Sequence, residues 1–232
     1  MIVFHRFHGF ITQLMPAFFI TGTDTGVGKT WFTCTLLRTW LGAGHNSAAL
    51  KPIASGDRDD AVQIHHAIGA RLTLDEINPV HFKKPVAPLA AARAENRTID
   101  FSALNHSIQK LRTKFSHFAV EGVGGWRVPL APDYDVRAWA RDLGMPVIVV
   151  ARGTLGTLNH TQLTVDSIRA AGLTCAGVVV NAGPSTGNDS PDLDLARLEN
   201  CVLLRELLAL PVLELGRGVE TVGRLPAWLG GE

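Results

Sequence analysis

The stretch Gly22-Thr-Asp-Thr-Gly-Val-Gly-Lys-Thr30 decides the fold of this chain. It lies between a short apolar segment, Ala17–Thr21, and a segment with helical spacing, Lys29–Ala43. Glycines allow the backbone to curl so that successive N–H groups and the N-terminus of the following helix face a phosphate. Lys29 adds a positive charge, and Thr30 adds a hydroxyl that suits Mg²⁺. The pattern therefore predicts a phosphate-binding loop between a strand and a helix.

Short apolar runs and amphipathic helical segments alternate along the rest of the chain. Several of the runs are continuously apolar, which is typical of strands buried on both faces of a parallel sheet. We therefore predict a single three-layer α/β domain with a mostly parallel central sheet, of the P-loop NTPase type. The predicted strands are Ala17–Thr21, Ser47–Lys51, His117–Glu121, Pro146–Ala151, Cys175–Asn181 and Pro211–Leu215. The predicted helices are Lys29–Ala43, Asp60–Gly69, Ser102–Phe115, Val136–Leu143, Asn159–Ala171 and Asp192–Leu208.

Two stretches interrupt this alternation. Residues 78–97 contain three prolines, and residues 182–191 are rich in Gly, Ser, Asn and Pro, so both are predicted to be surface loops. Long loops on a rigid sheet are common places for ligand binding. We predict that residues 1–16 form an N-terminal extension and that residues 17–232 form the folded domain.

Composition narrows the class of function. The 22 basic and 21 acidic residues give a net charge of +1, which is too small to hold a nucleic acid or a membrane surface without a local basic patch. The longest apolar run, Pro146–Ala151, is far shorter than the roughly 20 residues that span a bilayer. Three widely spaced cysteines, Cys34, Cys175 and Cys201, favour a reducing compartment over a disulfide framework. We expect a cytoplasmic protein whose partners are small molecules.

Polar residues follow several of the predicted strands. In an open parallel sheet, ligands bind beyond the carboxyl ends of the strands, so these residues should lie close together. Glu121 ends one apolar strand and precedes three glycines within four residues, which suits a ligand of Mg²⁺. Asp60 could supply a second carboxylate to the same ion, and it could equally cap the helix that it begins.

Lys51 ends the second predicted strand and is the residue that we expect at the reacting centre. Its ammonium could balance the charge of a phosphoryl group in transfer and orient an anionic acceptor. Ser55 and Gly56 follow within five residues and add a hydroxyl and an uncrowded backbone. The alternative is an ordinary surface lysine.

Five motifs together resemble the dethiobiotin synthetase family. They are TGTDTGVGKT (21–30), KPIASG (51–56), EGVGGW (121–126), LGTLNHTQLT (155–164) and VVVN (178–181), and the resemblance runs from Ala17 to about Leu215. It implies a homodimeric enzyme that joins 7,8-diaminopelargonate and CO₂ into dethiobiotin, using ATP and Mg²⁺. A carbamate of the substrate would attack the γ-phosphate, and the second amine would then close the ring on the mixed anhydride.

The resemblance also assigns roles to residues of this chain. Lys51 and Lys29 would be catalytic, and Thr30, Asp60 and Glu121 would hold Mg²⁺. The nucleotide would be bound by Gly26, Val27, Gly28, Lys29, Thr30, Trp31, Asp60, Glu121, Gly122, Val123, Gly124, Asn181, Ala182 and Gly216, with Asn181 at the adenine. The diamine would be bound by Thr25, Ser55, Leu155, Gly156 and Asn159, the last three reaching across a dimer interface.

A partition-type ATPase switch, which binds a protein or DNA partner, is the alternative function with the same fold. Such proteins carry an extra lysine inside the phosphate loop, and residues 23–26 contain none. The chain also lacks a basic or amphipathic terminal segment that could act as an anchor. The sequence therefore favours the synthetase.

Overall fold

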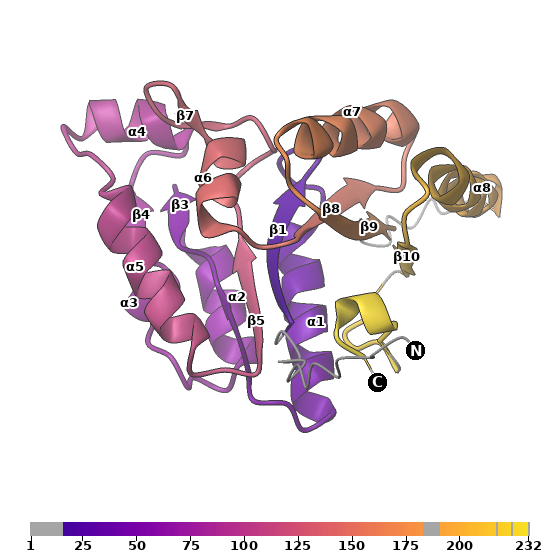
Figure 1. Ribbon diagram of the computed structural model, residues 1–232, viewed down its shortest axis with the longest axis horizontal. Helices are drawn as coiled ribbons and strands as arrows, with labels where there is room; N and C mark the ends of the chain where they lie inside the picture. The colour runs from indigo at the N-terminus through magenta and orange to yellow at the C-terminus, as the bar shows by residue number, and fades with distance from the viewer. Residues whose placement is uncertain (1–15, 183–190, 217, 224, 232) are drawn as a thin grey trace, which may run out of the picture.

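A computed structural model describes residues 16–182, 191–216, 218–223 and 225–231, with only the backbone described for 191–197. Its centre is a six-stranded parallel sheet in the order β10-β9-β8-β1-β5-β2 (Figure 1). The strands of this sheet are β1 (Ala17–Gly22), β2 (Ser47–Leu50), β5 (His117–Glu121), β8 (Val147–Arg152), β9 (Cys175–Asn181) and β10 (Val212–Leu215). All six predicted strands are therefore present, and the predicted fold class is confirmed.

Helices cover both faces of this sheet, as Figure 1 shows. The six predicted helices correspond to α1 (Lys29–Gly42), α2 (Asp59–Ala67), α5 (Phe101–Arg112), α6 (Val136–Leu143), α7 (Thr157–Ala170) and α8 (Pro191–Leu208). Side-chain caps fix the starts of two of them. The Asp100 carboxylate accepts the Ala103 N–H before α5, and the Asp135 carboxylate accepts the Ala138 N–H before α6, each at 2.9 Å.

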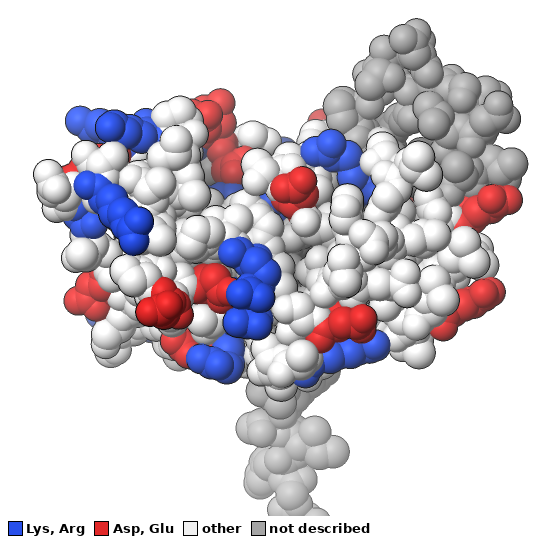
Figure 2. All heavy atoms as spheres, turned by 90° about the horizontal axis from the view of Figure 1, so that it is seen from above, with Lys and Arg blue, Asp and Glu red and all other residues white. Residues whose placement is uncertain are grey.

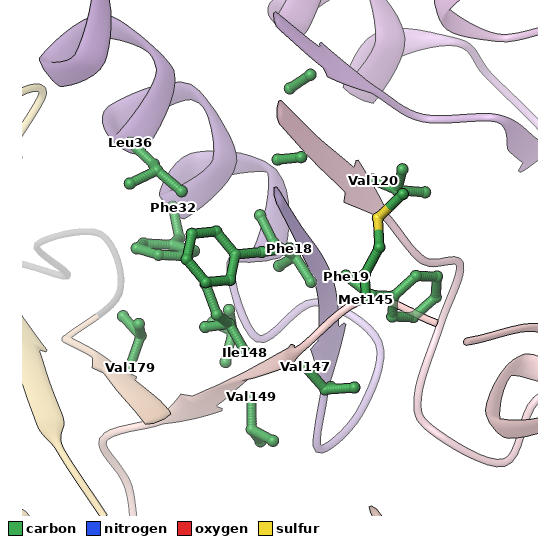
Figure 3. Close-up of a cluster of buried hydrophobic side chains, with 14 of the residues drawn as sticks. Phe18, Phe19, Phe32, Leu36, Val120, Met145, Val147, Ile148, Val149 and Val179 are labelled. Atoms are coloured by element: carbon green, nitrogen blue, oxygen red, sulfur yellow. The ribbon is translucent and has the colours of Figure 1, made fainter. Parts of the chain in front are cut away.

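The alternation of side chains along the strands divides the core into two halves (Figure 3). Phe18 and Ile148 point toward Phe32 and Leu36 of α1, whereas Phe19 points to the opposite face. There the ring of Phe19 meets Trp139 of α6 edge-on, with the ring centroids 5.4 Å apart. Both faces of the central strands are buried, so the sheet is rigid. It holds in place the loops at its carboxyl edge, where the carboxyl ends of the parallel strands lie.

The structure also contains short elements that the sequence did not predict. The stretch 78–97, predicted to be a loop, contributes β4 (Val80–Phe82) and α4 (Pro88–Ala94), and β4 pairs in parallel with β3 (Ile53–Ser55). The other additions are α3 (Leu74–Ile77), the antiparallel pair β6 (Pro129–Ala131) and β7 (Tyr134–Asp135), and η1 (Ala227–Leu229). The loop prediction for 78–97 was wrong in part, because strands of three residues are defined by their pairing partner rather than by a local pattern.

Two further predictions fall mostly outside the described residues. They are the N-terminal extension, residues 1–16, and the loop, residues 182–191. Only residue 16 of the extension and only residues 182 and 191 of the loop are described. All three cysteines are buried, and none of them forms a disulfide.

Candidate functional site

The phosphate-binding loop follows β1 and ends at the first residue of α1. Gly26 and Gly28 have φ of 70° and 93°, a left-handed backbone that residues with a Cβ adopt only with strain. Gly28 is the N-cap of α1, and no side chain caps this helix. The N–H groups of its first turn are therefore free to face a ligand, which is the arrangement that binds phosphate.

Two neighbouring strands brace this loop. The Asn181 amide at the end of β9 donates to the Val27 carbonyl at 3.0 Å, and a Cβ at Gly28 would overlap that amide. The Arg152 guanidinium at the end of β8 donates to the carbonyls of Thr25 and Gly26 at 3.3 and 3.2 Å. Gly28 is therefore required twice, for its backbone conformation and for the space that Asn181 fills.

A cluster of charged side chains lies beside the loop. The Lys51 ammonium donates to Glu121 Oε1 at 2.6 Å and to Asp60 Oδ2 at 2.7 Å. The Thr30 hydroxyl donates to the same Glu121 oxygen at 2.8 Å. Lys29 Nζ donates to the Asp24 carbonyl at 3.2 Å. These charges meet at the carboxyl edge of the sheet. Lys29, Lys51 and Glu121 are all buried, so water screens their charges weakly.

The surroundings shift the protonation equilibria of this cluster. Burial, together with the neighbouring Lys51 ammonium, lowers the pKa of Lys29 to about 8. Burial alone would also lower the pKa of Lys51, but the carboxylates of Glu121 and Asp60 outweigh it and raise that pKa above its usual value. For Asp60, burial works against ionisation, but Lys51 outweighs it and holds the pKa below the usual range. Lys51 is therefore held as an ammonium.

The glycine-rich turn after Glu121 packs against the phosphate loop. A Cβ on Gly125 would come within 3.4 Å of the Asp24 Cα, and one on Gly122 would lie 3.1 Å from the Phe19 ring. Gly124 has φ of 62°. Gly125 thus lets this turn meet the phosphate loop with backbone against backbone.

A cavity of about 600 Å³ opens between these loops, β3 and the segment before α4. The predicted site residues that line it are Thr25, Gly26, Gly28, Lys29, Thr30, Trp31, Lys51, Ser55, Asp60, Val123 and Gly124. It lies at the carboxyl edge of the sheet, the side that Figure 2 views from above, where basic and acidic side chains are interspersed. This volume is within the usual range of small-molecule sites.

The oxygen atoms in this cluster fit a magnesium ion. Among the described residues no group of three His, Cys, Asp or Glu side chains could hold a metal by itself. Mg²⁺, however, is usually bound by one or two carboxylates together with the phosphates of the substrate. Thr30, Asp60 and Glu121 offer hydroxyl and carboxylate oxygens, and the Lys51 ammonium that bridges the two carboxylates marks a place where positive charge is stabilised.

Several predicted residues lie outside the cavity. Asn181 is buried, Ala182 donates its N–H to the Leu215 carbonyl at 3.0 Å, and Gly216 follows β10. At the start of α7, Leu155 is fully exposed, Asn159 is exposed, and Gly156 is the N-cap with φ of 89°. The roles of these residues toward adenine and the substrate stay predictions.

Other residues of the site were not predicted from the sequence. Residues 85–88 form one wall of the cavity, and Asp57 and Gln63 line it as well. Thr33 donates its hydroxyl to Glu121 Oε2 at 2.7 Å. Its position three residues after Thr30 places both hydroxyls on one side of the helix, and this spacing is a signal that could have been found.

This parallel sheet and phosphate loop define a P-loop NTPase, and the AAA domain family matches residues 16–226. The chain is 38% identical to the ATP-dependent dethiobiotin synthetase BioD of Akkermansia muciniphila, over 86% of this chain and 91% of the relative. It is 42% identical to the BioD protein of Anaeromyxobacter dehalogenans strain 2CP-C, over 84% and 89%. The chain belongs to the ATP-dependent dethiobiotin synthetase family.

Two solved structures with similar folds share less sequence with this chain. The septum site-determining protein MinD of Pyrococcus horikoshii, complexed with Mg-ADP, aligns with a TM-score of 0.51 at 19% identity, over 85% of this chain and 79% of that chain. The cell division protein FtsY of Thermotoga maritima aligns with a TM-score of 0.55 at 12% identity, over 92% and 66%. At these identities the likeness supports the fold alone. In the described part of the chain, no helix has the length and apolarity to cross a membrane.

Proposed function

We propose that this chain joins 7,8-diaminopelargonate and CO₂ into the ureido ring of dethiobiotin, with ATP converted to ADP and phosphate. Membership of the dethiobiotin synthetase family supports the reaction. The observation that carries the assignment to this site is the position of Lys51. Its ammonium bridges Glu121 and Asp60 at the wall of the same cavity that the phosphate loop and Lys29 line.

The first half of the reaction needs positioning and charge stabilisation. One substrate amine adds through its nitrogen to the carbon of CO₂, and loss of a proton gives a carbamate. A carbamate oxygen then attacks the γ-phosphorus, the bond to the bridging oxygen of ADP breaks, and a carbamic–phosphoric anhydride results. Phosphoryl transfer requires little covalent help from a protein. The ammonium groups of Lys29 and Lys51 stabilise the charge that builds on the phosphoryl oxygens.

Thr30, Asp60 and Glu121 would hold Mg²⁺ with the nucleotide phosphates. When bound, the ion neutralises phosphate charge and polarises the transferred group. Lys51 is paired with the two carboxylates in this structure, so its ammonium would share them with the ion.

The second half closes the ring. The other amine attacks the carbonyl carbon of the anhydride, phosphate leaves, and the amine loses its proton. Ser55 Oγ is buried without a hydrogen-bond partner among the described residues and belongs to a residue that lines the cavity. An unpaired buried hydroxyl is costly, so we assign Ser55 to a polar group of the diamine. Thr25 lines the same cavity and is assigned to the substrate as well.

We also propose a homodimer in the cytoplasm. Support for the dimer comes from large apolar side chains that are exposed just before α7, on α7 and on α8, two helices that contact each other. They are Leu155, Leu163, Leu198, Val202, Leu203 and Leu207. Leu155, Gly156 and Asn159 would bind the substrate of the partner subunit. Sedimentation equilibrium should give twice the mass of one chain, and a single-chain mass at micromolar concentration would contradict the dimer.

The deciding experiment measures phosphate release from MgATP and bicarbonate with and without the diamine. The proposed function requires release that depends on the diamine and yields dethiobiotin, identified by mass spectrometry. A chain carrying Lys51→Gln is the control for a contaminating activity. Phosphate release that responds to a protein or DNA partner and not to the diamine would instead identify a switch ATPase.

A further inference from the structure

The carboxylate of Glu121 is held on both of its oxygens. Glu121 is fully buried at the end of β5, where an ionised carboxylate requires partners for its lone pairs. Oε1 accepts from Thr30 and Lys51, which both line the cavity. Oε2 accepts from Thr33, which is 1% exposed and is not among the described residues that line the cavity. The two oxygens therefore have different partners, since those of Oε1 line the cavity and that of Oε2 is buried.

The hydroxyl of Thr33 has two acceptors within reach. It lies 2.7 Å from Glu121 Oε2 and 2.9 Å from the Lys29 carbonyl. A hydroxyl carries one proton, and a charged acceptor makes the stronger hydrogen bond. The Lys29 carbonyl also accepts a backbone N–H within α1, whereas Thr33 is the donor to Oε2 among the described residues. The proton of Thr33 is therefore best used on Glu121.

Helix geometry fixes this arrangement. Thr30 and Thr33 lie in the first two turns of α1, and residues three apart share a helix face. Their hydroxyls reach opposite oxygens of one carboxylate, which prevents its rotation. A carboxylate that cannot rotate keeps Oε1 directed at Thr30, Lys51 and the cation that these residues would share.

We propose that Thr33 is a positioning residue that orients Glu121 for binding of the magnesium ion with the nucleotide. The proposal rests on the proposed function, since it concerns the same cation site. Thr33 does not line the cavity among the described residues, so it acts through Glu121. Groups that orient a metal ligand typically change metal affinity by about 10–100-fold when removed.

The test compares Thr33→Val, which keeps the shape and loses the hydroxyl, with Thr33→Ser, which keeps the hydroxyl and loses a methyl group. Mn²⁺ binding in the presence of ADP is measured by electron paramagnetic resonance. We expect the dissociation constant for Mn²⁺ to rise about tenfold in Thr33→Val and to stay within about threefold of the unmodified chain in Thr33→Ser. The KM for ATP at saturating Mg²⁺ should change less than the Mg²⁺ concentration that gives half-maximal turnover.

A purely structural role gives a different pattern. It would lower the unfolding temperature of both variants and leave Mn²⁺ affinity unchanged, which would overturn the proposal, as would equal impairment of Thr33→Ser and Thr33→Val. If Thr33→Val does not fold, Thr33→Cys, a weak donor of similar size, should bind Mn²⁺ with intermediate affinity. Unmodified affinity in Thr33→Cys would then overturn the proposal.

Failure of the proposed function has its own signature. Absence of diamine-dependent phosphate release in the unmodified chain would end the synthetase assignment, while the Mn²⁺ comparison would still decide the role of Thr33. Absence of Mn²⁺ binding with ADP in the unmodified chain would overturn the inference about Thr33 directly.

Discussion

The two edges of the central sheet differ in how their polar groups are satisfied. At the carboxyl edge, buried charges meet one another, and Ser55 keeps a hydroxyl without a partner among the described residues. At the amino edge, the Trp40 indole donates to the Leu229 carbonyl at 2.9 Å, and His117 Nε2 lies 3.3 Å from the Gly230 carbonyl. In Figure 1, η1 lies beside α1 at this end. The carboxyl edge therefore holds polar groups that can bind a ligand, and the hydrogen bonds at the amino edge stabilise the fold.

This difference has an energetic meaning. Buried ion pairs such as Lys51 with Glu121 contribute little net stability, because desolvation of the charges offsets their attraction. Their presence at the carboxyl edge is better explained by chemistry than by folding. Substitutions at the carboxyl edge should therefore lower turnover, and substitutions at the amino edge should lower stability.

The largest expected effect is that of Lys51→Gln. Turnover should fall by about 10²-fold or more, because the charge of Lys51 matters most in the transition state. ATP affinity should change by only a few-fold, as measured by equilibrium binding. Lys110→Gln, at an exposed lysine on α5, is the control and should retain full turnover. Near-normal turnover in Lys51→Gln would remove Lys51 from the reacting centre.

Lys29→Ala should act on nucleotide binding itself. A hydrogen bond to a charged group contributes about 1.5–3 kcal/mol, which corresponds to a loss of ATP affinity of about 10–100-fold. Isothermal titration with MgATP measures it. If ATP affinity is unchanged and only turnover falls, Lys29 acts in the reaction as Lys51 does, and the proposed role of Lys29 in nucleotide binding is wrong.

Trp40→Phe tests the amino edge. The indole is fully buried, and its loss leaves the Leu229 carbonyl without this donor and opens a small cavity. The free energy of unfolding should fall by about 1–3 kcal/mol in urea denaturation. kcat and KM for ATP should stay unchanged at a temperature where the variant is folded. A variant with normal stability and reduced kcat would contradict the division between the edges.

The smallest expected effect is a pH dependence from His117. Burial, with a contribution from His45, whose ring stacks at 4.0 Å, lowers the pKa of His117 despite its contact with the Gly230 carbonyl. Because the unfolded chain takes up this proton first, stability is complete above about pH 6.5 and is lost as the pH falls below it.

Urea midpoints at pH 7.5 and 5.5 measure this effect. His117→Gln, which has no titratable group, should show a smaller difference between the two pH values than the unmodified chain. The same pH dependence in both proteins would assign it to the other eight histidines of the chain.

The sequence predicted the central sheet well because its strands are mostly apolar runs separated by complete helices. Val147–Arg152 is buried along most of its length, and its continuous apolar pattern predicts this directly. The β3–β4 pair could not be predicted in this way. Ile53–Ser55 and Val80–Phe82 become strands because the chain brings them together, and the prolines nearby indicated a loop.

The candidate site likewise has one part that the sequence predicted and one part that it did not. Lys29, Thr30, Lys51 and Glu121 follow strands or begin a helix, so the parallel topology alone predicts that they share one edge. The cavity wall at residues 85–88 comes from outside the main sheet, and no periodic pattern connects it to the phosphate loop.

By itself the amino-acid sequence determined the order of strands and helices along the chain, the phosphate-binding loop and the family. Those features are local, since they depend on hydrophobic spacing, on glycines and on short motifs. Only the tertiary structure decided that Lys51 bridges Asp60 and Glu121, that Asn181 braces Val27 and that Thr33 holds the second oxygen of Glu121. Hydrogen bonds between residues far apart in the chain depend on ångström-scale packing of whole elements, which no local pattern of residues specifies.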